Sequence, residues 1–201
     1  MGLVFLLFIG TNLYLHDFFN AHEWMAASSD EVFKKHEYWR PWTTLFAHAD
    51  FVHILSNLVL FFPFAYFLIG FFGSVFFPLV GFFIGGLVNM IVLKTMPENA
   101  HLIGVSGVVY WMGAAWIALV FFIDRREKKS KRFLKALGVS VILFLPETYQ
   151  PEVSYLTHFV GYLTGIISGS VFYYLKRKEF HAAEVMEWVY EEDFSASEDP
   201  L

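Results

Sequence analysis

Cysteine is absent from this chain of 201 residues, and its absence excludes several kinds of chemistry at once. Without a thiol the chain has no disulfide, no thiolate metal site and no cysteine nucleophile. Two His-Glu pairs, at 22–23 and 36–37, lack the second histidine of a zinc-binding His-Glu-x-x-His helix. We therefore expect no metal and no cofactor.

Positive charge is missing from the C-terminal end of the chain. No lysine or arginine follows Lys178, whereas eight acidic residues do: Glu179, Glu184, Glu187, Glu191, Glu192, Asp193, Glu198 and Asp199. The net charge of −5 is therefore concentrated there, and the remainder is slightly basic. We expect 179–201 to be an acidic, partly disordered tail, with weak helical character up to about Tyr190, because its end has too little apolar surface to order itself.

Charged residues are scarce overall, and apolar residues take their place. The chain is 16% charged, where soluble domains carry about a quarter. It is 57% hydrophobic, with a mean hydropathy of +0.51 and with 25 Phe, 6 Trp and 10 Tyr. Such a composition suits lipid-facing surfaces and interfacial aromatic belts. It predicts an all-α membrane protein.

Six apolar runs are candidate membrane spans, since a span needs about 20 apolar residues. They lie near 2–19, 51–70, 73–93, 104–123, 133–147 and 154–175. We expect them to form one domain, residues 1–178. The fifth run is short, so a reading with five spans or a re-entrant segment stays open. The first lacks the basic region and cleavage site of a signal peptide, which favours a retained helix.

Two basic segments set the expected orientation. Six basic residues against two acidic ones lie between Asp124 and Arg132, and Lys176-Arg177-Lys178 follows the last run. The positive-inside rule places both in the cytoplasm. With six spans, both termini are then cytoplasmic, and we expect a multi-pass protein of the cell (inner) membrane. Residues 20–50 become the first external loop, which we expect to be interfacial and partly helical.

Few ionisable residues fall inside the apolar runs. Within them the titratable residues reduce essentially to His53 and His158, and every Asp and Glu lies in a loop, in the tail or at a span end. Ionisable groups inside a bilayer are costly and usually functional. No Gly-Asp or Tyr-Asp pair lies in a span, which disfavours an aspartyl protease and leaves a hydroxyl nucleophile as the alternative.

Ser106 is the candidate nucleophile. It lies in Gly104-Val105-Ser106-Gly107 at the start of the fourth run, where free backbone N–H groups and the helix dipole favour negative charge on a nearby oxygen. The glycines permit close approach of a substrate backbone. Taken alone, the motif is more typical of a serine cap beside small packing residues.

His158 is the candidate base. It lies three residues before Gly161, and Gly165 and Gly169 continue the same helical face. Glycines four residues apart let a second helix pack at close backbone distance. If that helix is the fourth run, His158 can accept the Ser106 proton and return it to the leaving amine.

Three further side chains have plausible supporting roles. Tyr110 is four residues after Ser106 and could stack on the imidazole, or it could be an ordinary packing residue. His53 and Asn57 share one helical face and, with the Ser106 N–H, could hold an oxyanion. They could equally form a polar clasp between helices. Asp50 is the expected N-cap of their helix.

Taken together, these motifs resemble the rhomboid family of intramembrane serine proteases. The resemblance runs from Glu37-Tyr38-Trp39-Arg40 and Ala47-His48 through His53-Ile54-Leu55-Ser56-Asn57 and Gly104 to Tyr110, and ends with His158 to Gly161 and Gly165. It implies a six-helix rhomboid-like bundle with a Ser106–His158 dyad. It also implies an oxyanion hole of His53, Asn57 and the Ser106 N–H, supported by Tyr110 and Gly104, and a first external loop that contains Trp39 and Arg40. Thr44 stands where some members have histidine, and we expect no loss of chemistry from it.

The resemblance implies transmembrane proteins as substrates, within the lipid bilayer, and no nucleic acid; the oligomeric state is not readable. A non-enzymatic scaffold with this fold would predict damaged catalytic positions. A transporter or channel would predict midspan acidic residues or broken helices. The sequence favours the protease over both.

Overall fold

A computed structural model describes residues 2–144 and 154–185 of the protein. Its longer helices are α1 (Gly2–Leu15), α4 (Phe51–Ser74), α5 (Gly81–Leu93), α6 (Ser106–Ile123), α7 (Lys129–Phe144) and α8 (Tyr155–Ala182). The shorter elements are η1 (Phe18–Asn20), α2 (Ala21–Trp24), β1 (Ala27–Ser28), η2 (Asp30–Lys34), α3 (Arg40–Thr43), η3 (Thr44–Phe46), η4 (Val75–Val80) and β2 (His101–Leu102). The predicted all-helical character is confirmed apart from the two-residue strands β1 and β2, which pair antiparallel.

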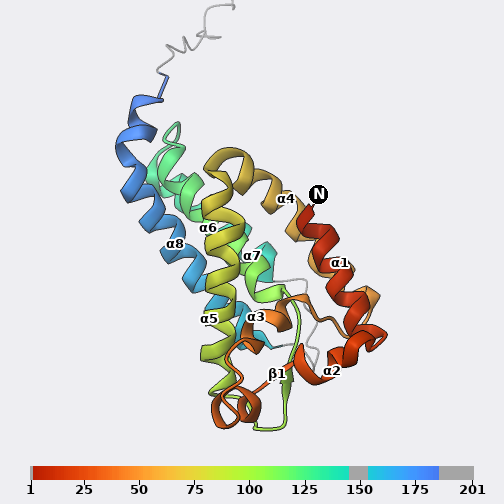
Figure 1. Ribbon diagram of the computed structural model, residues 1–201. Helices are drawn as coiled ribbons and strands as arrows, with labels where there is room; N and C mark the ends of the chain where they lie inside the picture. Colours follow the sequence, from red (N-terminus) through yellow and green to blue (C-terminus); the bar gives the residue numbers. More distant parts are fainter. Residues whose placement is uncertain (1, 145–153, 186–201) are drawn as a thin grey trace, which may run out of the picture.

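Helix α6 is the centre of the bundle (Figure 1). It is buried on nearly every side, as expected for a helix that is apolar all round. Helices α4, α5, α7 and α8 pack around it, and α8 is its main partner. The residues that begin α6 are therefore enclosed by several other helices.

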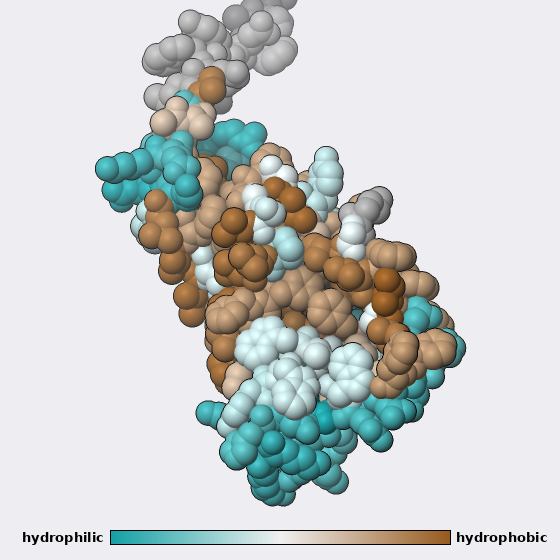
Figure 2. All heavy atoms as spheres, viewed as in Figure 1, coloured by the Kyte–Doolittle hydropathy of each residue, from teal (hydrophilic) through white to brown (hydrophobic). Residues whose placement is uncertain are grey.

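The outer surface carries an apolar belt between two hydrophilic ends (Figure 2). Large apolar side chains on α4, α7 and α8 are exposed, among them Val52, Leu134 and Ile167. Exposed apolar surface on this scale is stable in hydrocarbon and not in water. Together with the apolar helices described next, it makes this chain an integral membrane protein.

Two helical stretches are long and apolar enough to cross a membrane, Phe51–Leu93 and Ser106–Ile123. A third qualifies if Gly2–Leu15 and Phe18–Trp24, bent by 108° from each other, count as one span. The 43-residue stretch contains α4 and α5, and the chain reverses between them (Figure 1). Gly73, at φ +84°, and Phe77, which is extended, interrupt the helix there. Length and apolarity alone thus support two or three spans in the described part of the chain.

The predicted end of the first apolar run at residue 19 is wrong. Helix α1 ends at Leu15, and Asp17, Phe19 and Asn20 adopt the left-handed conformation, with φ of 50°, 59° and 55°. The carboxylate of Asp17 accepts a hydrogen bond from the backbone N–H of His22 at 2.9 Å. This local turn, which hydropathy does not register, redirects the chain before the run ends.

The last two helices also differ from their predicted bounds. Helix α7 begins at Lys129 instead of residue 133, because Lys131 and Lys135 both pair with Glu127 and extend the helix through charged residues. Its predicted end at 147 lies outside the described residues. Helix α8 continues to Ala182, so the domain boundary drawn after residue 178 falls inside a helix. The tail from residue 186 lies outside the described residues.

The segment 20–50 is partly helical, as predicted. Arg40 holds it together from a position that is only 4% exposed. Its guanidinium pairs with Glu37 and with Glu31, and donates to the backbone carbonyls of Glu23 and Ala26. A buried cation with this many partners fixes the loop against the bundle.

Candidate active site

The candidate site forms where α6 and α8 approach at backbone distance. A Cβ added to Gly161 would overlap the carbonyl oxygen of Gly107, and one added to Gly169 would lie 2.6 Å from that of Ala115. In the other direction, a Cβ on Gly107 would lie 2.8 Å from Thr157 Cγ2. Only glycine fits such contacts. The glycine face of α8 therefore packs on α6, as its four-residue spacing predicted, and Gly165 lies against Trp111 in the same way.

Ser106 is the first residue of α6. The N-cap position is occupied by Val105, and no side chain caps this end. The alternative explanation of Ser106 as a serine cap is therefore not supported. Ser106 is partly exposed, and it lies at the positive end of the helix dipole, beside backbone N–H groups that the helix leaves unpaired.

His158 is buried on α8, with 3% of its surface exposed. The ring of Tyr110 stacks on the imidazole, with 4.2 Å between centroids and 12° between planes. The Tyr110 hydroxyl donates to the carbonyl oxygen of Leu143 at 3.1 Å, which links this stack to α7. Thr157 and Gly161, on either side of His158 in the sequence, both contact Gly107. His158 therefore lies on the face of α8 that packs against the first turn of α6.

His53 lies beside the loop that precedes Ser106. Gly104 has φ +109°, and a Cβ placed there would lie 3.0 Å from Nε2 of His53. Residue 104 therefore needs glycine both for its backbone conformation and for the room that the imidazole takes. The Asp50 carboxylate accepts from the His53 backbone N–H at 2.7 Å, which confirms the predicted N-cap.

Asn57 is buried one turn further along α4, with 7% exposed. Its side-chain amide donates to the carbonyl oxygen of His53 at 3.2 Å. This bond engages one of the two N–H groups of the amide within α4.

Thr44 and His48, for which the sequence motifs predicted no role, hold the loop before Ser106. The backbone N–H of Gly104 donates to the Thr44 carbonyl at 3.0 Å, and the Thr44 hydroxyl donates to the carbonyl of Leu102. The backbone N–H of Val105 donates to His48 Nε2 at 3.4 Å. Both Thr44 and His48 are completely buried. The only sequence signal was their position inside the motif that also contains His53.

The tautomer of His48 follows from its partners. Thr11 donates its hydroxyl proton to the carbonyl of Leu7 at 2.9 Å, so its oxygen accepts from His48 Nδ1 at 2.9 Å. Nε2 is then the unprotonated nitrogen that accepts from Val105. Burial lowers the pKa of His48 to about 3, with a smaller contribution from His53. The neutral ring therefore ties α1 to the loop before Ser106.

Trp39 and Arg40 lie away from this contact, in the segment 20–50. Trp39 is 52% exposed, whereas Arg40 is buried among the carbonyls and carboxylates described above. Arg40 thus has a structural place in the loop, and its neighbour presents an aromatic side chain on the surface.

Comparison with known proteins agrees with these motifs. A family model of the Rhomboid domain matches residues 35–175. The match covers Arg40, all of the helices α4 to α7 and most of α8. A search of curated proteins finds no match.

Proposed function

This chain belongs to the rhomboid family, whose members are intramembrane serine proteases that act on membrane-protein substrates, and we propose that it is an active member. Its reaction would be hydrolysis of peptide bonds in or near transmembrane helices. Ser106 would be the nucleophile and His158 the base, with no acidic third residue.

One observation carries this proposal: α8 and α4 both pack against the start of α6 and the loop before it. Gly161 and Thr157 of α8 contact Gly107, Tyr110 stacks on His158, and His53 borders Gly104. A partly exposed serine at the start of α6 and a buried imidazole on the adjoining helix α8 suit catalysis, because the nucleophile can reach a substrate while the base is shielded from bulk water.

The proposed reaction has two stages. Ser106 Oγ attacks the scissile carbonyl carbon as its proton passes to His158, and the C–N bond then breaks as His158 protonates the leaving amine. The products are an acyl-enzyme ester and a free amine. His158 next takes a proton from water, whose oxygen attacks the ester, and Ser106 leaves with that proton. Tyr110 supports the imidazole by stacking.

The oxyanion of each tetrahedral intermediate needs hydrogen-bond donors. We assign this role to the Ser106 backbone N–H, the His53 ring and the second N–H of the Asn57 amide. Gly104 supports the hole because its left-handed backbone leaves room for the His53 ring. Loss of one such donor typically lowers turnover by about 10²–10³.

We also propose six spans with both termini in the cytoplasm of a cell (inner) membrane. The reversal between α4 and α5 supports their assignment as two spans. The basic residues around the start of α7 and at Lys176–Lys178 in α8 support a shared cytoplasmic side. Single-cysteine labelling checks this arrangement: Lys35, whose exposed side chain lies in the same loop as Glu31, should be accessible from outside, and Ser130 and Ser197 from inside. Accessibility of Lys35 and Ser130 from the same side contradicts it.

The dyad is tested by cleavage of a transmembrane substrate and by fluorophosphonate labelling of the purified chain. Ser106→Ala and His158→Ala should each abolish cleavage while the protein still unfolds cooperatively. Because nucleophile and base act as a unit, the double variant should be hardly worse than either single one. The fluorophosphonate should label the parent and fail with His158→Ala.

Ser170→Ala and His16→Ala are matched controls. Ser170 donates to the carbonyl of Ile166 within α8, and His16 lies after the end of α1. Both variants should cleave and label as the parent does. Robust cleavage by folded Ser106→Ala, with contaminating proteases excluded, would rule out Ser106 as the nucleophile. A folded parent that neither cleaves nor labels would instead favour a non-enzymatic scaffold.

A further inference from the structure

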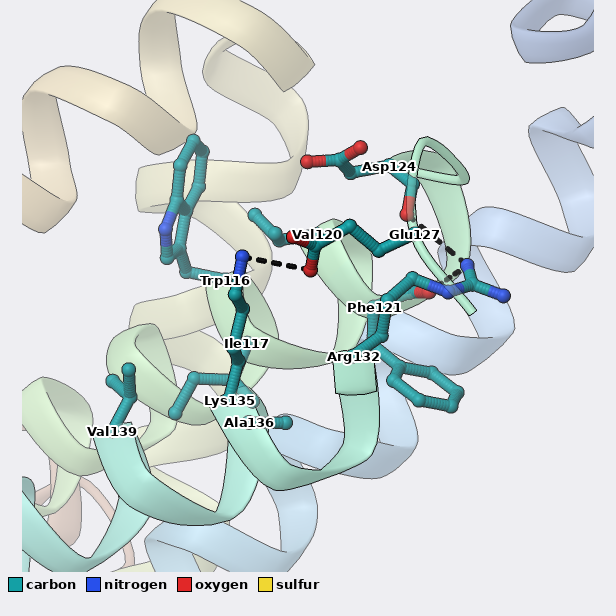
Figure 3. Close-up of a pocket in the computed structure, with 10 residues that line it drawn as sticks. All are labelled: Trp116, Ile117, Val120, Phe121, Asp124, Glu127, Arg132, Lys135, Ala136 and Val139. Carbon is teal, nitrogen blue, oxygen red and sulfur yellow. Dashed lines mark hydrogen bonds and ion pairs between the residues drawn. The ribbon is translucent and has the colours of Figure 1, made fainter. Parts of the chain in front are cut away.

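A cavity of about 240 Å³ lies between α6 and α7, away from the candidate active site (Figure 3). Its apolar wall consists of Trp116, Ile117, Val120, Phe121, Ala136 and Val139. Four charged residues line its remaining side: Asp124, Glu127, Arg132 and Lys135. The cavity is therefore apolar along the helices and polar at the end that carries the basic segment.

Hydrocarbon, and not water, is the medium on the open side of this cavity. Val120 and Val139 on its wall are 39% and 43% exposed, and neighbouring apolar residues of α7 such as Leu134 and Ile142 are 65% exposed. On the inner side Trp116 stacks on Phe67 of α4, with 4.9 Å between ring centroids. An acyl chain can enter such a space laterally and contact an aromatic floor.

The charged end of the cavity has N–H groups that could donate to an anion. Arg132 donates through Nη1 alone to the carbonyls of Phe121 and Asp124, at 2.7 and 3.1 Å, so among the described residues its second terminal nitrogen, Nη2, has no acceptor. Lys135 pairs with Glu127 at 2.7 Å, which engages one of its three N–H groups. Residues 124–135 contain seven basic and two acidic residues, so this end attracts anions.

We propose that this cavity binds one anionic phospholipid from the adjoining leaflet. One acyl chain lies along Trp116, Val120 and Val139, and the phosphate accepts hydrogen bonds from Lys135 and Arg132. Basic pockets between membrane helices recognise lipid headgroups by this combination of hydrocarbon and cation. The site is independent of the proposed proteolysis, since no residue of the candidate active site lines it.

Native mass spectrometry of the purified full chain in detergent tests the site, with dioleoyl phosphatidylglycerol and dioleoyl phosphatidylcholine as probes. The parent should retain one phosphatidylglycerol in preference to phosphatidylcholine. Lys135→Gln should weaken retention by at least about tenfold, because a charge-assisted hydrogen bond is lost. Lys129→Gln, which removes the same charge outside the cavity, should weaken it by about fivefold at most.

A second pair of variants tests the chain-binding part. Ala136→Phe places a ring inside the cavity and should abolish retention. Gly138→Phe adds the same ring on the outer face of α7, where no described atom lies within 4 Å of an added Cβ, and should retain the lipid. If Ala136→Phe fails to unfold cooperatively, Lys135→Gln carries the test, since Glu127 keeps its pairing with Lys131 at 2.9 Å.

Three results would overturn the proposal. Equal retention by Ala136→Phe and Gly138→Phe would show that no chain occupies the cavity. Equal losses with Lys135→Gln and Lys129→Gln would reduce the effect to general surface charge. Binding of chain-free glycerol phosphate as tightly as the lipid would identify an anion site instead.

Discussion

Replacing Gly161 by alanine should separate the two helices that carry the candidate dyad. The added Cβ would lie 3.2 Å from the carbonyl carbon of Gly107 and 3.3 Å from its Cα, and it would overlap the carbonyl oxygen. Carbon atoms pack best at about 3.5–4.0 Å, so α8 must move away from α6 by an amount on the order of 1 Å. Both neighbours are backbone atoms of a helix, which cannot turn aside as a side chain would.

The expected losses of stability and of turnover in Gly161→Ala can be estimated separately. Overpacking a tight contact costs about 1–3 kcal/mol, and the better helix propensity of alanine offsets about 1 kcal/mol of it. The net loss of stability should therefore be at most about 2 kcal/mol. A misplacement of about 1 Å between reacting groups can lower turnover about 10²-fold. The variant should therefore stay folded while its turnover falls about 10²-fold.

The assay pairs substrate cleavage with thermal unfolding in the same detergent, and fluorophosphonate labelling reports on Ser106 directly. Gly70→Ala is the control, because no described atom lies within 4 Å of its added Cβ. That variant should keep the parental cleavage rate and gain up to about 1 kcal/mol of stability. Gly169→Ala, further from Ser106 along α8, should lower the rate less than Gly161→Ala does.

Parental cleavage by stable Gly161→Ala would refute this reasoning. The close approach at Gly107 would then not determine the position of His158 relative to Ser106. A loss of activity that only follows the loss of folded protein, with labelling of the folded fraction unchanged, would also refute it.

Three further predictions concern the loops around the site. Since the pKa of His48 is about 3 when folded and about 6.5 when unfolded, the unfolded chain binds more protons between these values, and acid destabilises the fold. Lowering the pH from 6.5 to 5 should cost about 1.6 kcal/mol through this residue, and His48→Gln should remove that part of the pH dependence in unfolding experiments. Gly104→Ala should lower turnover about 10²-fold and stability by about 1–3 kcal/mol, because residue 104 has φ +109° and the His53 ring is close. A cleavage rate equal to that of the parent would argue against this. Arg40→Ala should lose about 3 kcal/mol or more of stability in thermal unfolding, because Glu31 and Glu37 would lose their buried cationic partner. An unchanged stability would contradict the structural role of Arg40.

Much of the helical framework follows from the sequence alone, because a long apolar run has few alternatives in a bilayer. The runs at 51–70 and 104–123 correspond to α4 and α6, whereas α5 begins only at Gly81, inside the run predicted at 73–93. Backbone groups in hydrocarbon must bond within their own segment, so apolar runs of this length become helices whatever surrounds them.

Helix ends were less predictable, because local interactions set them. Three left-handed residues end α1 early, and ion pairs carry α7 and α8 into charged sequence. Hydropathy averages over such contacts and cannot resolve them.

The candidate site, like the helices, was predictable from the sequence only in part. Its residue types are readable from motifs, because Ser106, His158 and the glycine spacing each require a particular side chain or the lack of one. The sequence by itself thus determined the chemistry available to this protein and the helices that carry it. The tertiary structure alone decided that Thr44 and His48 hold the loop before Ser106, and that α6 and α7 enclose a cavity. Each of these depends on contacts between segments far apart in the chain, and no local pattern encodes the distance between them.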